Sequence, residues 1–113
     1  MQDKFYKKNV SKEWLIANGF RYNRNLSDDE THIYTHRFPV FKYEKMIVLE
    51  CELSIAIGND EVKINVYAYG TNDKYAAFYY CEYGYYDKML KNIWNKIEHM
   101  LNKLQIKRKI NNE

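Results

Sequence analysis

The sequence predicts a small α+β domain with a short N-terminal helix, an antiparallel sheet of four to five strands, and a long C-terminal amphipathic helix packed on one sheet face. Strict apolar alternation over residues 47–57, resumed after a polar turn, predicts two antiparallel strands. Apolar spacing of three and four near the C-terminus predicts the helix. A chain of 113 residues suits one core, so we expect a single domain over 1–113.

The N-terminal third is expected to hold a short helix and two strands. Ser11 is a typical N-cap residue and Gly19 a typical helix terminator, which predicts a helix over residues 12–18. Alternation at residues 20–23 predicts a first strand, and residues 31–38 a second. Pro39 cannot donate to a sheet ladder, so residues 40–45 are expected to form an edge, a bulge or a loop.

Residues 46–69 predict a β-hairpin more strongly than any other part of the chain. With Asn59 and Asp60 at its tip, apolar residues face one another across the hairpin, from Ile57 opposite Val62 onward. A slip of one residue would move every apolar side chain to the polar face. The hairpin therefore separates a buried side from a solvated side.

The next segment, residues 74–83, reads as an aromatic-rich strand whose register is ambiguous. One register turns Tyr75 and Tyr79 inward, and the other turns Phe78 and Tyr80 inward together with Glu82. We prefer the first because the second buries a lone carboxylate.

A helix is expected from a cap at Asp87 to about residue 107, followed by a frayed basic tail over 107–113. Its apolar stripe is broad enough to pack on a sheet. The stripe comprises Tyr86, Leu90, Ile93, Ile97, Met100 and Leu104, widened by Met89, Trp94 and Leu101.

Catalytic and metal-binding patterns fail on geometry, so we expect no enzyme, no metal and no cofactor. His32 and His36 would lie roughly 13 Å apart on a strand, too far to share an ion. Glu50 and Glu52 are spaced as ordinary surface residues of a strand. Cys51 and Cys81, each in a strand-like apolar run, suit packing better than nucleophilic attack.

The cellular setting is also predicted from composition. No apolar run approaches the roughly 18 residues of a membrane span, and the charged opening lacks the core of a signal peptide. Two cysteines in strand-like runs favour a reducing compartment. We expect a cytoplasmic protein that does not bind membranes.

Tyrosine abundance points to a binding function, since tyrosine is enriched at protein interfaces. In the predicted register Tyr67 lies opposite Glu52, and Tyr69 opposite Glu50, on the solvated face. The candidate partner-binding residues on this face are Tyr67, Tyr69, Glu50, Glu52, Phe78 and Tyr80. Our first hypothesis is a non-enzymatic protein that binds another protein there.

Charge distribution supports a competing hypothesis of nucleic-acid binding. Residues 1–25 carry six Lys or Arg against two acids, residues 26–87 five against eleven, and residues 88–113 seven against two. Basic ends that converge in space would attract phosphate. The residues concerned are Lys4, Lys7, Lys8, Lys12, Lys103, Lys107, Arg108 and Lys109. A structural homodimer through the terminal helix is a third hypothesis.

One pattern carries a resemblance to a group of proteins. The run from Trp14 to Phe20, the antiparallel strands after it, the aromatic segment from Tyr75 to Tyr80 and a Lys-rich terminal helix resemble small accessory proteins of phages and mobile elements in low-GC Gram-positive bacteria. The resemblance implies an accessory role through binding a host or phage protein. Some anti-CRISPR and other anti-defence inhibitors are similar in size and class, although many are acidic DNA mimics and this chain has basic ends.

Overall fold

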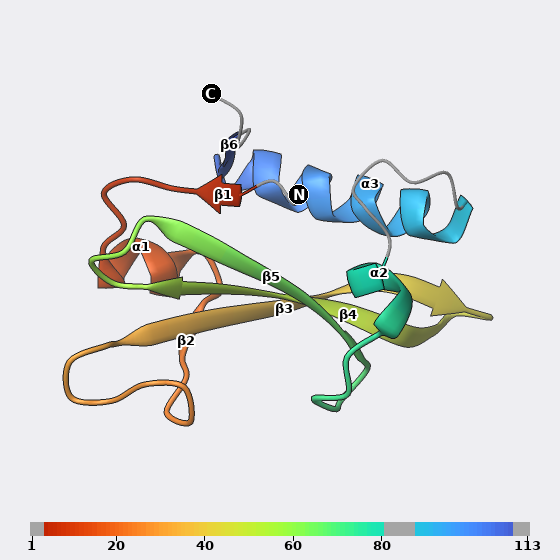
Figure 1. Ribbon diagram of the computed structural model, residues 1–113, viewed down its shortest axis with the longest axis horizontal. Helices are drawn as coiled ribbons and strands as arrows, with labels where there is room; N and C mark the ends of the chain where they lie inside the picture. The colour runs from red at the N-terminus through yellow and green to blue at the C-terminus, as the bar shows by residue number, and fades with distance from the viewer. Residues whose placement is uncertain (1–3, 81–87, 110–113) are drawn as a thin grey trace.

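A computed structural model of the chain describes residues 4–80 and 88–109, which form a six-stranded sheet with three helices (Figure 1). The strands are β1 (Lys4–Tyr6), β2 (Arg21–Tyr22), β3 (Ile33–Tyr43), β4 (Met46–Ala56), β5 (Glu61–Ala68) and β6 (Lys107–Lys109). The helices are α1 (Lys12–Ala17), α2 (Ala76–Tyr80) and α3 (Lys88–Lys103). The strand order is β2-β3-β4-β5-β1-β6, with every pair antiparallel. The α+β class is confirmed, with more strands than the four to five expected.

One face of the sheet, here called the covered face, holds the core. Alternate residues of β4 from Leu49 to Ile55 are buried on it, and the residues opposite them in β5 share that face. The helix α3 lies along this side of the sheet (Figure 1) and buries Leu90, Ile93 and Ile97. The expected packing of the C-terminal helix on one sheet face is confirmed.

The β4–β5 hairpin has the predicted faces but a different register. Ile55 lies opposite Val62 and Cys51 opposite Val66, so each partner is displaced by two residues from the predicted pairing. The loop contains four residues, 57–60, because Gly58 turns with φ +89° and the Asn59 side chain accepts a hydrogen bond from the Glu61 N–H at 3.0 Å. A shift of two leaves each side chain on its own face.

The predicted strand over residues 74–83 is wrong. Lys74 makes one bridge to Tyr67, and the chain then forms α2, while residues 81–83 lie outside the described part. Tyr75, Phe78 and Tyr79 are spaced three and four apart, so they fit one side of a helix as well as a strand pattern.

This segment hydrogen-bonds to the backbone of β5 on the side of that strand away from β4. The Tyr75 N–H donates to the Val66 carbonyl at 2.9 Å, and the Tyr79 hydroxyl accepts from the Val66 N–H at 3.0 Å. The Tyr79 hydroxyl also donates to the Asn65 side-chain oxygen at 2.9 Å. A helical turn therefore satisfies backbone groups that a further strand would otherwise have paired.

The C-terminal helix ends earlier than expected. It stops at Lys103 because Gln105 adopts a left-handed conformation with φ +58°, and the Ile106 N–H then returns to the Leu101 carbonyl at 2.8 Å. The first part of the tail expected to fray, 107–109, is strand β6 and pairs with β1. Tyr86, Asp87 and residues 110–113 lie outside the described residues.

The N-terminal helix is confirmed as α1, ending one residue before the predicted position. The Ser11 hydroxyl accepts from the Trp14 N–H at 3.1 Å, and Gly19 follows with φ +88°. A Cβ atom at position 19, as in any residue other than glycine, would also lie 3.1 Å from the His36 ring. The glycine is therefore required both by the backbone turn and by the close approach of β3.

Strand β3 continues five residues beyond the predicted end at residue 38. It passes through Pro39 with register shifts on either side of Phe41, so the expected irregularity is a bulge within a long strand. The hairpin to β4 turns at Glu44 and Lys45, which both have positive φ, at 48° and 70°. Positive φ at both central residues is the geometry of a type I′ turn.

Candidate interaction face

The second face of the sheet, here called the outer face, lies opposite α3 (Figure 1). It carries the polar residues of β4 and β5 that alternate with those of the covered face. Strand pairing places Arg37 opposite Glu52, and Glu50 opposite both Pro39 and Tyr67. Of the six residues predicted to bind a partner, Tyr67, Tyr69, Glu50 and Glu52 are therefore brought together on this face.

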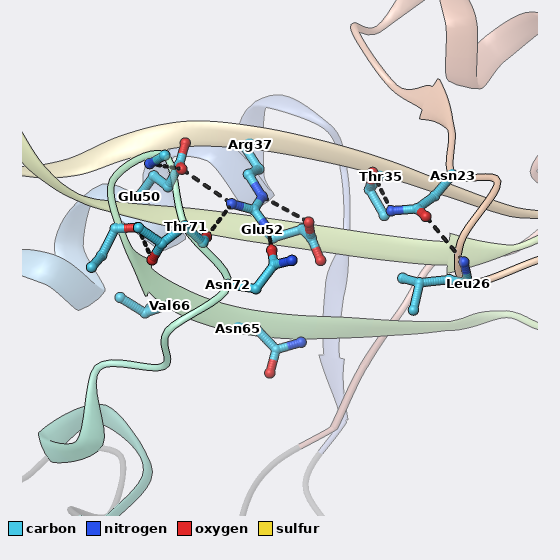
Figure 2. A network of polar contacts seen from close by, with 12 residues as sticks. Asn23, Leu26, Thr35, Arg37, Glu50, Glu52, Asn65, Val66, Thr71 and Asn72 are labelled. Carbon is cyan, nitrogen blue, oxygen red and sulfur yellow. Dashed lines mark hydrogen bonds and ion pairs between the residues drawn. The ribbon is translucent and has the colours of Figure 1, made fainter.

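The two glutamates are joined by Arg37, which the sequence analysis did not single out (Figure 2). Its Nε donates to Glu52 Oε2 at 2.8 Å and its Nη1 to Glu50 Oε2 at 3.1 Å. The guanidinium also donates to the Thr71 carbonyl at 2.7 Å and to the Asn72 side chain. One side chain thus ties β3 and β4 to the loop that follows β5.

Both carboxylates are buried by this arrangement, with Glu50 8% exposed and Glu52 5% exposed. The Gly70 N–H donates a further hydrogen bond to Glu50 at 2.9 Å. Burial alone lowers the pKa of Arg37, but its hydrogen bonds and attraction to Glu52 and Glu50 outweigh that effect and raise the pKa. Both carboxylates are held within the fold. They are therefore not free to contact a partner, although the sequence analysis named Glu50 and Glu52 as partner-binding residues.

Tyr67 belongs to the same network. The Arg37 guanidinium lies 4.5 Å from the centre of its ring, a distance typical of a cation–π contact. Burial and the charge of Glu52 raise the pKa of Tyr67, while Arg37 opposes that shift. Half-buried Tyr67 packs within the molecule and offers only part of its ring to a partner.

Two of the predicted partner-binding residues are not placed on the outer face. Phe78 is buried in the core, where its ring stacks 5.0 Å from Trp94 of α3. Tyr80 is the last residue of α2. Their assignment to the outer face required residues 74–83 to form a strand, and the helical turn removes that alternation.

Tyr69 remains exposed and joins an apolar group that the sequence analysis missed. The Tyr69 N–H donates to the Val48 carbonyl at 2.9 Å, and Tyr43 pairs with Met46 at the hairpin tip. By strand alternation all four side chains lie on the outer face. We call them the apolar end, with exposed fractions of 56% for Tyr69, 40% for Val48, 65% for Tyr43 and 72% for Met46.

The apolar end was missed because the bulge after Pro39 hides the alternation of β3. Residues 40–45 show no clean period in sequence, so Tyr43 could not be assigned to a face. A signal was present in β4, where Met46 and Val48 fall at the same alternate positions as Glu50 and Glu52. Apolar residues on the polar side of a strand indicate an exposed patch.

The basic ends of the chain converge, which is the condition set by the nucleic-acid hypothesis. Strand β6 pairs with β1, so that Lys4 lies opposite Lys109, Phe5 opposite Arg108 and Tyr6 opposite Lys107. The other predicted basic residues lie elsewhere. Lys7 covers the Trp14 ring at 4.7 Å, Lys8 precedes α1, Lys12 begins α1, and Lys103 ends α3.

Groups with reactive chemistry lie mainly in structural positions. Burial and then the charge of Glu52 raise the pKa of the Cys51 thiol well above its usual value, which disfavours the nucleophilic thiolate. The His36 Nδ1 lies 3.0 Å from the Gly19 carbonyl, and His32 precedes β3. Within residues 4–80 and 88–109, no three His, Cys, Asp or Glu side chains gather in a way that could hold a metal ion.

Comparison with protein-family models, with curated proteins and with solved structures found no match to this chain. Among the described helices, none combines the length and the apolar character needed to cross a membrane.

Proposed function

We propose that this protein acts by binding another protein through the apolar end of its outer face. The observation that carries the proposal is the exposure of Tyr43, Met46, Val48 and Tyr69 side by side on three adjacent strand ends. Large apolar side chains gathered on a solvent-facing surface are typical of interaction sites. Tyrosine and methionine are both enriched in such interfaces.

The surroundings of the apolar end fit an interface. Arg37 neutralises part of the charge of Glu50 and Glu52 within the fold, so a partner need not desolvate free carboxylates to reach the patch. The hydrogen-bonded strands beneath it present the side chains on a rigid frame, which limits the entropy lost on binding. The resemblance to phage and mobile-element accessory proteins favours an inhibitor of a defence or regulatory protein as the specific form of this function.

The large exposed apolar residues of the described part of the chain do not include any from α3. The apolar residues of that helix are buried or half-buried against the sheet. We therefore favour the apolar end over the terminal helix as the site of contact with a partner protein.

A matched pair of variants tests the proposal by affinity capture from host extract. Met46→Ser with Tyr69→Ser removes the patch, while Ile16→Ser with Leu26→Ser removes two residues of similar exposure elsewhere, at 56% and 51%. We expect a specific partner to be retained by the wild type and the control pair, and lost by the patch variant. Retention should change little with salt because the contact is apolar.

Two results would contradict the proposal. A partner retained equally by both variants would place the contact elsewhere. A molecular mass that doubles with concentration, and stays monomeric only in the Met46→Ser and Tyr69→Ser variant, would make the patch a contact between identical chains.

A further inference from the structure

A row of cationic and hydroxyl side chains crosses the outer face away from the apolar end. Strand pairing places Arg21 opposite Thr35, Thr35 opposite Ser54, and Ser54 opposite Lys63. Directly paired residues on neighbouring strands share one face. These four residues therefore form a line across β2, β3, β4 and β5.

The line continues onto the two strands that join the ends of the chain. Phe5 lies opposite Val62, so the preceding residue, Lys4, is in register with Lys63, and Lys4 also lies opposite Lys109. The positions of this cation row are Arg21, Thr35, Ser54, Lys63, Lys4 and Lys109. With strands about 4.8 Å apart, the distance from Arg21 to Lys4 is roughly 19 Å.

Three cations of the row can be followed to their side chains. Within the described part of the chain, Arg21, Lys63 and Lys4 form no ion pair with a carboxylate, and all three are exposed. Like charges directly opposite one another destabilise a sheet. Lys4 beside Lys63 is thus a cost that a bound anion would relieve.

Acids of the described residues also lie near the row, and Asp60 accepts the Lys7 N–H through its carbonyl at 2.9 Å. Glu61 lies opposite Tyr6 in the adjacent row, and Glu52 is held by Arg37. Asp28 lies in the loop between β2 and β3, where its carboxylate accepts the Glu30 and Thr31 N–H groups. The exposed cations Lys63 and Lys4 lie on β5 and β1, away from that loop in the strand order.

We propose that the cation row binds the backbone of single-stranded nucleic acid, separately from the protein-binding end. Lysines and hydroxyl groups are the usual partners of phosphate oxygens. Ser54 and Thr35 supply hydroxyls between the cations, and from the described residues the Thr35 oxygen accepts one long hydrogen bond, from Asn23 at 3.4 Å (Figure 2). Tyr6, half-buried next to Lys4 and opposite Lys107, offers a ring for stacking a base.

A single strand fits the surface better than other polyanions. Aromatic side chains on a sheet face recognise unpaired bases, which a duplex does not expose, and half-buried Tyr6 offers part of such a ring. A membrane-binding surface needs apolar side chains to insert among lipids, and the large exposed apolar residues of the described chain do not include any in this row.

Fluorescence anisotropy with a labelled oligothymidylate at low salt tests the proposal. The row variant is Lys4→Gln with Lys63→Gln, and the control is Lys88→Gln with Lys96→Gln, which removes equal charge from exposed positions of α3. We expect about tenfold weaker binding for the row variant and less than twofold for the control. Losing two phosphate contacts should also reduce the slope of log K against log salt by about 1.4.

Two further measurements make the outcome decisive. Tyr6→Leu is expected to weaken binding severalfold while leaving the salt slope unchanged, because stacking releases no counterions. The row variant should melt at or above the wild-type temperature, since it removes like-charge repulsion, and so a loss of binding cannot be attributed to unfolding.

Equal weakening in the row and control variants would overturn the proposal by showing diffuse attraction. Tighter binding to vesicles of anionic phospholipid than to the oligonucleotide, lost in the row variant, would assign the row to a membrane instead. An unchanged affinity in Tyr6→Leu would overturn the stacking role. If the Met46→Ser and Tyr69→Ser variant still captured its partner, the proposed protein-binding site would be wrong, but the nucleic-acid results would stand. The two sites share no residue.

Discussion

The two faces of the sheet are built from the same strands, but one holds the buried core and the other carries the Arg37 network and the two proposed binding sites. On the covered face, residues such as Leu53 and Ile55 are fully buried beneath the helices, and their removal from water stabilises the fold. On the outer face, one arginine network lies between the apolar end and the cation row. From this comparison we expect stability to be spread over many residues on one face and concentrated at Arg37 on the other.

The largest expected effect separates the two faces directly. Leu53→Ala, on the covered face, should lower the free energy of unfolding by about 3 kcal/mol, because it leaves a cavity in a closed core. Val48→Ala, on the outer face of the same strand, should cost less than about 0.5 kcal/mol. Urea unfolding measures both, and equal losses would show that the outer face is covered in solution.

Replacing Arg37 tests whether one outer-face residue is as important as a core residue. Arg37→Met leaves two buried carboxylates without their cation, and we expect a loss of about 2 kcal/mol, reduced from the full penalty because the guanidinium is partly exposed. Adding Glu50→Gln and Glu52→Gln should recover most of that loss. A single variant as stable as the wild type would show that the network contributes little.

A third test probes how tightly the covered side is closed where α1 meets β3. Gly19→Ala should lower the free energy of unfolding by about 1 to 2 kcal/mol, because φ is +88° and the new methyl would lie 3.1 Å from the His36 ring. His36→Ala in the same background should relieve only the contact, leaving the backbone strain. Full recovery in that double variant would mean that the backbone conformation costs nothing.

The smallest expected effect is at the contact between Tyr79 of α2 and the backbone of β5. Tyr79→Phe leaves the Val66 N–H without an acceptor and should lower the free energy of unfolding, measured in urea, by about 1 kcal/mol.

The same variant tests the alkaline pH dependence of stability. Burial raises the pKa of Tyr79 and of Tyr67, so the folded state keeps protons that the unfolded state loses above about pH 10. Stability should therefore fall as pH rises beyond 10, and less steeply in Tyr79→Phe. An identical alkaline fall in both proteins would exclude Tyr79 as a contributor.

Local patterns in the sequence predicted the covered face well. The apolar alternation of residues 47–57 assigns every β4 side chain to its correct face, and the spacing of Leu90, Ile93 and Ile97 identifies the buried side of α3. The hairpin register was displaced because a four-residue loop and a two-residue loop bury the same side chains. Alternation determines the sheet face on which a side chain lies, but it does not determine which residue of the neighbouring strand lies opposite.

Features that depend on distant contacts could not be predicted. Strands β1 and β6 have three residues each, too few to show a period, and they pair only because the fold brings them together. Arg37 gives no signal by itself, since its importance comes from the cross-strand position of Glu52 and the later loop at Thr71. The segment from Tyr75 to Tyr80 satisfies helix and strand patterns equally, and the structure has it as α2 with hydrogen bonds to Val66.

The pairing of β1 with β6 has a consequence for the order of folding. Lys4 and Lys109 are about 100 residues apart in sequence, so their contact closes a very long loop, whereas the β4–β5 hairpin closes a short one. We expect the hairpin to form early and the β1–β6 ribbon late. The cation row is then complete only in fully folded molecules, and a ligand that binds it would act as a selective stabiliser of that final state.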